Sequence, residues 1–382
     1  MADSDPPLIA RVAPGIASIP RSEWDALAGG DDPFLSHDFL SLLETSGSVG
    51  PETGWQAAPI VIDGADGALA AAMPAYIKGH SQGEYVFDQA WADAWHRAGG
   101  YYYPKLQICV PFTPVPGRRL LAHDDALART LIAAAQALVI ENGLSSAHAT
   151  FVALDQIALF EDAGWLVRRD SQFHWHDKGF GDFEGFLAAL SSRKRKAIRK
   201  ERATAQAAVT IAALTGEAIR PDHWDILWAC YQDTGLRKWG RPYLTRAAFD
   251  LMGERMADRI LLVIASDRAS GQPVAAALNF IGADVLYGRY WGALADIDCL
   301  HFELCYYQAI DFALAHGLAR VEAGAQGAHK LARGYEPVAT WSAHNILHDG
   351  FRSAVADFLS RETYAAEQES DWLAHMSPFK KV

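Results

Sequence analysis

The sequence predicts an α+β protein that contains two copies of one structural unit. After residue 208 the pattern reads strand, helices, antiparallel strands, helix, strand, helix, strand. The part before residue 170 shows a shortened version of the same order. The chain has 382 residues, which is long for a single hydrophobic core. We therefore expect two domains, covering residues 1–170 and 171–382.

The composition is that of a folded protein, with 50% hydrophobic residues, 21% charged residues and 12 Trp. The formal net charge of −12 disfavours a protein that coats nucleic acid, so we expect no DNA partner. The four cysteines lack CxxC spacing and are expected to be reduced. The first residues lack a signal-peptide pattern, and the most apolar run is too short to cross a bilayer. These features predict a cytoplasmic protein with no membrane span.

The first half mixes helical and strand patterns. Apolar residues recur at helical spacing before a glycine in two places, and two apolar runs around a Gly/Asp turn predict a hairpin. The expected helices are 34–47 and 124–143, the hairpin is 58–77, and the expected strands are 102–112, 146–152 and 164–176.

The second half repeats this alternation at greater length. One long helix is expected first, followed by a strand and two helices, then three neighbouring strands. The expected helices are 182–208, 221–235, 245–258, 300–317 and a C-terminal amphipathic one, with a short turn-helix at 328–337. The expected strands are 208–214, 259–267, 273–282, 284–294, 319–324 and 338–348.

A basic block interrupts this acidic chain. Residues 193–202 hold seven basic residues and one acid, a charge of +6, so the remainder carries −18. On a helical wheel begun at Phe183, apolar residues form one stripe and most of the cations lie opposite. Lys194 alone falls within the apolar stripe, where it must snorkel, pair with an acid or face a ligand. The block is either a solvated helix face or a contact for a phosphate-bearing ligand.

The element order resembles the GNAT acyltransferase fold, and several segments resemble the FemAB-like proteins, relatives of the Fem aminoacyltransferases. Fem-type proteins also have a basic "IRKA" helix where this chain has its basic block. The resemblance implies tandem GNAT-like domains of α+β class with mixed, mostly antiparallel sheets. It also implies transfer of an amino acid from tRNA to a peptidoglycan-precursor stem peptide. The segments that carry it are 32–40, 87–121, 172–205, 236–249, 276–294, 301–318 and 321–344.

The resemblance places a transferase cleft after the strand at 284–294. Coenzyme A users usually carry Q/R-x-x-G-x-G/A there, and this chain has Arg289, Tyr290 and Gly292 but Leu294 at the last position. A small residue is needed there for close approach of phosphate, so Leu294 speaks against acetyl-CoA. Asp298 is the expected N-cap of the next helix. That helix supplies the candidate catalytic residues His301 and Glu303, and strand 319–324 supplies Glu322. The alternatives are that His301 and Glu303 are ordinary polar helix positions and that Glu322 forms a structural salt bridge.

Two further segments are candidate substrate contacts. Arg333-Gly334-Tyr335 resembles the Fem "F-K-K/R-G-F-G" segment, although Ala332 stands where that family has Lys. The loop at 237–243 combines cations with aromatic residues, which suits a sugar, peptide or anion. The expected substrate-binding residues are Lys194, Lys238, Trp239, Arg289, Tyr290, Gln326, His329, Lys330, Arg333 and Tyr335.

No metal site is expected, because the pairs His174/His176 and His344/His348 lack a third ligand. The sequence therefore predicts an N-acyl or aminoacyltransferase that needs no cofactor beyond its donor, either acyl-CoA or aminoacyl-tRNA. The acceptor is an amine of a small molecule or peptide, such as a peptidoglycan-type precursor. An acetyl-CoA-dependent N-acetyltransferase and a non-catalytic binding protein with the same fold are the alternatives.

Overall fold

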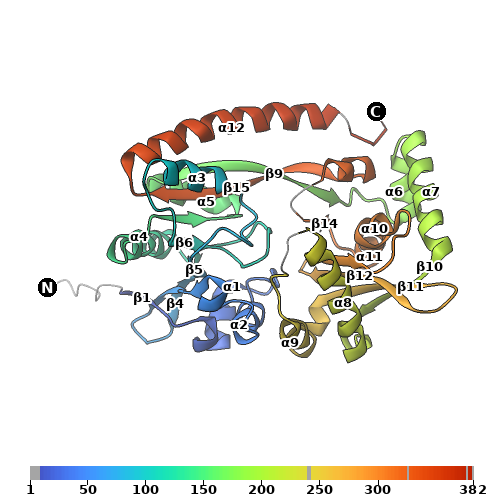
Figure 1. Ribbon diagram of the computed structural model, residues 1–382, viewed down its shortest axis with the longest axis horizontal. Helices are drawn as coiled ribbons and strands as arrows, with labels where there is room; N and C mark the ends of the chain where they lie inside the picture. The colour runs from blue at the N-terminus through green and yellow to red at the C-terminus, as the bar shows by residue number, and fades with distance from the viewer. Residues whose placement is uncertain (1–8, 239–241, 325–326, 376, 381–382) are drawn as a thin grey trace. The chain divides into compact units, whose positions relative to one another are not determined.

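A computed structural model describes residues 9–238, 242–324, 327–375 and 377–380. The chain divides into two compact units (Figure 1). Unit 1 comprises Met1–Asp170 and Ala339–Glu367, and unit 2 comprises Ser171–Val338 and Gln368–Val382. The first division of the chain follows Asp170. The segment Ala339–Glu367 was expected in the second domain but belongs to unit 1.

Unit 1 contains a mixed sheet and a smaller antiparallel one. The mixed sheet has the order β15-β8-β6-β5-β2, and the smaller sheet has the order β1-β3-β4-β7. Only β6 and β8 pair in parallel among the described strand pairs of this unit. The elements are β1 (Ala10–Val12), α1 (Arg21–Ala28), α2 (His37–Thr45), β2 (Trp55–Ala57), β3 (Ile60–Asp63), β4 (Leu69–Met73), β5 (Ala75–Lys78), α3 (Gln89–Arg97), β6 (Lys105–Ile108), β7 (Leu121–Ala122), α4 (Asp125–Glu141), β8 (Ser146–Ala149) and α5 (Leu154–Asp162).

Helix α4 shows how sequence sets these elements. Its N-cap Asp124 accepts a hydrogen bond from the Leu127 amide, and Gly143 with φ 60° follows the last turn. Its apolar side chains join those of β5, β6 and β8 in the core of the unit. The expected helix 124–143 and strand 146–152 are therefore present.

Unit 2 contains a longer mixed sheet with the order β10-β11-β12-β13-β14-β9. Strands β10 to β13 run antiparallel to one another, and β13 pairs in parallel with β14. The elements are α6 (Phe183–Ala189), α7 (Ser192–Ala208), β10 (Val209–Thr215), α8 (Pro221–Lys238), α9 (Arg246–Met256), β11 (Ile260–Asp267), β12 (Pro273–Ile281), β13 (Val285–Ala293), α10 (Leu300–Phe302), a π-helical turn η5 (Glu303–Tyr307), α11 (Gln308–Ala315), β14 (Arg320–Glu322) and the 3₁₀ helix η6 (Ala328–Arg333).

Three elements cross the division between the units in the chain, namely β9 (Leu166–His176), β15 (Glu336–Ile346) and α12 (Asp349–His375). Strand β9 follows the helices of unit 1, but its residues from Ser171 belong to unit 2, where 174–176 pair with β14. Strand β15 follows η6, but its residues from Ala339 belong to unit 1, where 343–346 pair with β8. Each unit therefore contains part of a strand that begins in the other unit: unit 2 contains the end of β9, and unit 1 contains the end of β15.

The prediction of a single helix over 182–208 is wrong, because this segment forms two helices, α6 and α7. Leu190 is extended, with φ −77° and ψ 155°, and forms a β-bridge with Phe379. The amide of Ser191 donates to the carbonyl of Pro378 at 3.0 Å. These backbone bonds end α6 and restart the helix at Ser192, so a wheel begun at Phe183 does not predict the faces of α7.

No helix among the described residues combines the length and apolarity that a membrane crossing needs. The four cysteines are free thiols. Within the same residues, His, Cys, Asp and Glu form no group of three or more that could hold a metal ion.

Candidate active site

The parallel strands of unit 2 separate partway along their length. Pairing between β13 and β14 ends with Tyr287 opposite Glu322, where β14 also ends, while β13 continues to Ala293. The element after β13 begins with α10, and η6 follows β14. Side chains of α10 and of η6 can therefore meet at the opening between β13 and β14. We call this opening the splay.

Strand β13 directs its side chains to opposite faces beyond the splay. The Tyr290 ring lies 5.3 Å from that of Tyr231 on α8, and a Cβ on Gly292 would lie 1.9 Å from the Cys230 carbonyl oxygen. Tyr290 is therefore a buried packing residue, which corrects the expectation that it binds substrate. Trp291 instead contacts His301 of α10. Arg289 is the extra residue where the β12–β13 register shifts, and its charge lies close enough to Lys330 to lower the pKa of that lysine.

Aromatic rings and two histidines gather beside Trp291. The His301 ring centroid lies 5.0 Å from that of Trp291 and 5.3 Å from that of Tyr306. The Tyr306 hydroxyl lies 2.8 Å from Nε2 of His329. The two histidine rings are 6.2 Å apart. The fold thus brings together His301 and His329, both expected site residues, with Tyr306 and Trp291, which the sequence did not single out.

Lys330 is the buried cation of this group. Its side chain is almost completely buried, and its Nζ donates a 2.7 Å hydrogen bond to the Gly324 carbonyl just beyond β14. Burial, together with the positive charge of Arg289, lowers the pKa of Lys330 to about 8. Lys330 therefore carries an ammonium group that loses its proton more readily than an exposed lysine.

Arg333 positions its neighbours. Its Nη2 donates to both carboxylate oxygens of Glu201 at 2.9 and 3.0 Å, and Nη1 donates to the His329 carbonyl at 2.9 Å. The guanidinium lies 3.4 Å from the centre of the Phe302 ring. Arg333 is buried, so we assign it to holding His329 in place.

Tyr335 is completely buried within the unit 2 core, which corrects its expected role as a substrate contact. Its aromatic ring packs against Tyr306 with centroids 5.4 Å apart.

Glu303 is a structural carboxylate and not the expected catalytic one. It is fully buried in the π-helical turn. Arg202 donates to it at 3.1 and 3.2 Å, and the amides of Gln206 and Gln308 donate at 2.9 and 2.8 Å. These bonds occupy its acceptor sites. The expected N-cap Asp298 is also wrong, because Cys299, with φ 66°, occupies that position.

Glu322 lies in a buried ion pair. Its Oε1 accepts from Arg320 Nε at 3.0 Å and lies 3.7 Å from Nδ1 of His174. Burial, together with the positive charge of Arg320, lowers the pKa of His174 to about 3, so His174 stays neutral at physiological pH. The salt bridge, the alternative interpretation of Glu322, is the arrangement observed.

The structure gives little or no side-chain information on the remaining expected substrate-binding residues. Lys194 is half-buried on α7 and forms no ion pair within the described part of the chain. Trp239 and Gln326 lie outside the described residues, and Lys238 is described only as the end of α8.

Unit 1 contains a buried polar cluster that the sequence analysis missed. Lys105 Nζ donates to Glu84 at 2.7 Å and to Asp88 at 2.5 Å, and all three are buried. Lys78, also buried, lies 3.4 Å from the Trp55 ring centre. Burial lowers the pKa of Lys78 to about 7 and raises that of Glu84 to about 7.

Strand alternation was the available signal for this cluster. Tyr76 faces Gln107 and Lys78 faces Lys105 across β5 and β6, so these four polar side chains share one face. Short polar–apolar alternation in "AYIK" and "KLQI" indicates this pattern. The apolar face of the same strands joins the unit 1 core.

In unit 1 the parallel strands β6 and β8 do not separate as β13 and β14 do in unit 2. Gly117, in the chain after β6, forms a parallel bridge with Val152, after β8. Buried Arg119 donates to the carbonyl oxygens of Thr150 and Val115 at 2.9 and 2.8 Å. The protein's own backbone and a guanidinium therefore occupy this region of unit 1.

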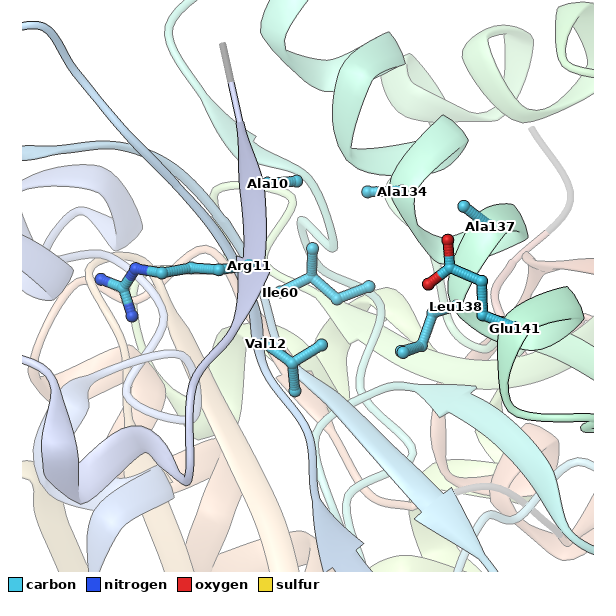
Figure 2. Close-up of a pocket in the computed structure, with 8 residues that line it drawn as sticks. All are labelled: Ala10, Arg11, Val12, Ile60, Ala134, Ala137, Leu138 and Glu141. Carbon is cyan, nitrogen blue, oxygen red and sulfur yellow. The ribbon is translucent and has the colours of Figure 1, made fainter.

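A groove with a cavity volume of about 270 Å³ lies between β1 and α4 (Figure 2). Figure 2 shows Arg11 pointing away from α4, and its guanidinium pairs with Asp63. The lining supplies alkyl groups and one carboxylate, which carry no transfer chemistry. It comprises Ala10, Arg11, Val12, Ile60, Ala134, Ala137, Leu138 and Glu141.

Solved structures share this fold over most of both chains. FemX aligns with 11% identity over 88% of this chain and 98% of its own, with a TM-score of 0.57. The C-terminal DUF2156 domain of a putative lysylphosphatidylglycerol synthetase from Agrobacterium fabrum aligns with 11% identity, 88% and 95% coverage and a TM-score of 0.55. L-PGS from Bacillus licheniformis gives 10% identity, 84% and 94% coverage and a TM-score of 0.51. These identities establish likeness of fold alone.

No curated protein matches the sequence significantly. The FemAB-like family, described as peptidoglycan biosynthesis/recognition, matches residues 15–381. The family resemblance and the tandem GNAT-like α+β fold expected from the sequence are confirmed, and the chain belongs to the FemAB-like family.

Proposed function

We propose that the protein is an N-acyl or aminoacyltransferase that works at the splay of unit 2. The observation that carries the proposal is the early end of β13–β14 pairing, with His301, His329 and Lys330 beside the opening. In a transferase of this fold, the donor carbonyl reaches such an opening and meets the acceptor amine there. The closed pair in unit 1 supports unit 2 as the site of transfer.

The proposed step is direct attack by an acceptor amine. Its nitrogen attacks the carbonyl carbon of an ester or thioester, the new C–N bond forms, and the C–O or C–S bond breaks. The amine loses one proton to a base, and the departing oxygen or sulfur gains one. No covalent enzyme intermediate is required.

His329 is the preferred base. Burial lowers its pKa below the usual value, and the charges of Arg333 and Lys330 lower it further, so it is neutral at physiological pH. The Tyr306 hydroxyl and the Arg333 bond to its backbone carbonyl hold it in place. His301, whose ring lies 6.2 Å from that of His329, is the second candidate for the base. Lys330 supplies positive charge for the oxyanion that develops on the carbonyl.

The local chemistry favours an aminoacyl ester over acetyl-CoA as donor. Gly292 is required by close packing on α8, so it does not indicate a phosphate loop. The Leu294 amide is bonded to the Val274 carbonyl at 2.7 Å. Asp296 and Asp298 precede the helix start, where a pyrophosphate would meet like charge. The family supports aminoacyl-tRNA as donor and a peptidoglycan-type precursor amine as acceptor.

Transfer assays test the proposal. The purified chain is incubated with charged tRNA, or separately with acyl-CoA, and with candidate peptide amines, and products are measured by mass spectrometry. Product from charged tRNA that is lost in His329→Ala supports the proposal. Product from acyl-CoA alone supports the acetyltransferase alternative, and no product from either donor supports the binding-protein alternative.

A further inference from the structure

Helix α7 presents a line of unpaired cations to solvent. Arg193, Lys196 and Lys200 are all exposed. At 100° and 1.5 Å per residue they lie within about 60° of one another and span roughly 10 Å of the helix. Nothing in the described part of the chain forms an ion pair with them, whereas Arg199 and Arg202 of the same helix are paired. We call these three residues the basic stripe.

A fourth cation comes from the other end of the sequence. The backbone of Lys380 donates to the Ala189 carbonyl at 3.0 Å, and Phe379 pairs with Leu190. The main chain of Lys380 therefore lies beside the segment that precedes α7. Its side chain is exposed and has no ion pair among the described residues. A further exposed cation is thus present on the C-terminal segment, beside the residues that precede α7.

Arg193 occupies an electrostatically unfavourable position in the first turn of α7. The N-terminus of a helix carries partial positive charge and favours acidic side chains. Here the first turn of α7 has no acid, and its N-cap Ser191 makes no side-chain capping bond. Among the described residues no acidic side chain pairs with Arg193 to offset this, a pattern typical of a functional surface.

We propose that the basic stripe and Lys380 form a docking surface for a membrane that carries anionic lipids. Clusters of four or more Lys and Arg on a helix are attracted to anionic headgroups at the cytoplasmic leaflet. The attraction is charge complementarity at the surface and involves no insertion. It is independent of the proposed transfer reaction, because it uses none of the splay residues.

The surface suits lipid headgroups better than single-stranded nucleic acid. Proteins that bind single strands combine cations with exposed aromatic rings on which bases stack. None of the exposed large apolar side chains in the described residues lies on α7. The exposed positions that flank these cations on α7 include Ala197 and Ala203, which offer no ring on which a base could stack.

Vesicle flotation tests the proposal with the full chain. Vesicles of phosphatidylcholine alone are compared with vesicles that contain about 30% phosphatidylglycerol, at low and at high salt. We expect binding to the anionic vesicles alone, and its loss at high salt. Lys196→Gln/Lys200→Gln should lower the partition coefficient roughly thirty-fold, since each lysine near the surface contributes about five-fold.

The matched control is Arg97→Gln/Arg361→Gln, which removes the same charge from exposed, unpaired positions of unit 1. It should bind vesicles as the unaltered protein does, and melting temperatures show whether each variant is folded. Equal loss in both double variants, or no preference for anionic vesicles, overturns the proposal. So does stripe-dependent binding to uncharged tRNA or to poly(U) RNA without any binding to vesicles.

Discussion

The hydroxyl of Tyr306 and Nε2 of His329 lie 2.8 Å apart, joining the π-helical turn after α10 to the 3₁₀ helix after β14. If His329 is the base, His329→Ala should lower kcat/KM about 10²–10⁴-fold with little change in melting temperature. Tyr306→Phe should give a smaller loss. Steady-state kinetics with the working donor measure both, and an unchanged kcat/KM in His329→Ala would remove His329 from the mechanism.

Arg333 should set the pH range of that base. Its positive charge helps to hold the pKa of His329 below the usual value, after burial. Arg333→Gln should therefore raise the pKa of His329 and move the acid limb of the kcat/KM–pH profile to higher pH. Arg333→Lys, which keeps the charge, should leave the limb near its original position. A limb that shifts equally in both variants would mean that geometry and not charge controls it.

Glu303 should act on stability. Glu303→Ala leaves half-buried Arg202 with Asp311 as its remaining carboxylate and removes the acceptor of two amides. We expect a loss of about 3 kcal/mol in the free energy of unfolding, measured by urea denaturation. Glu303→Gln, which keeps the shape, should lose less. A catalytic Glu303 would instead give a stable protein without activity.

Gly292 should be a packing residue. A Cβ there would lie 1.9 Å from the backbone of α8, so Gly292→Ala should lower the free energy of unfolding by about 1–3 kcal/mol or more. Gly79→Ala is the control, because no atom lies within 4 Å of its added Cβ. A stable Gly292→Ala with weakened donor binding would restore the phosphate-loop interpretation.

Lys78 should make stability depend on pH. Burial lowers its pKa from 10.5 to about 7, so above pH 7 the unfolded chain binds a proton there that the folded chain has released. The contribution of Lys78 to stability therefore rises with pH above 7. In Lys78→Met, the slope of unfolding free energy between pH 7 and 8.5 should fall by up to about 1 kcal/mol per pH unit. Exposed Lys178→Met should leave the slope unchanged.

Periodicity predicted much of the fold. Strands β11, β12 and β13 and the helices α4, α8 and α9 lie where the patterns place them, because long periodic segments reflect one buried face. The break at Leu190 was not predictable in this way. Its cause is pairing with Phe379, a residue 189 positions away, which no local pattern encodes.

The site was predicted in part for the same reason. The sequence indicated His301, His329 and Lys330, which the fold brings to one place. It could not show that Glu303 meets Arg202, or that Tyr335 is buried, because both depend on tertiary packing. Polar–apolar alternation indicates the polar face of β5 and β6. These strands are short, however, and alternation over so few residues is a weak signal.

The placement of β15 has a consequence for synthesis on the ribosome. Unit 1 lacks its β8 partner strand until residues 343–346 have emerged, after most of unit 2 has been made. A fragment ending at residue 170 would expose the unpaired edge of β8 and the apolar core surface that Ala343 covers in the full chain. The N-terminal half should therefore complete its fold late, and should need a chaperone or its C-terminal segment to stay in solution.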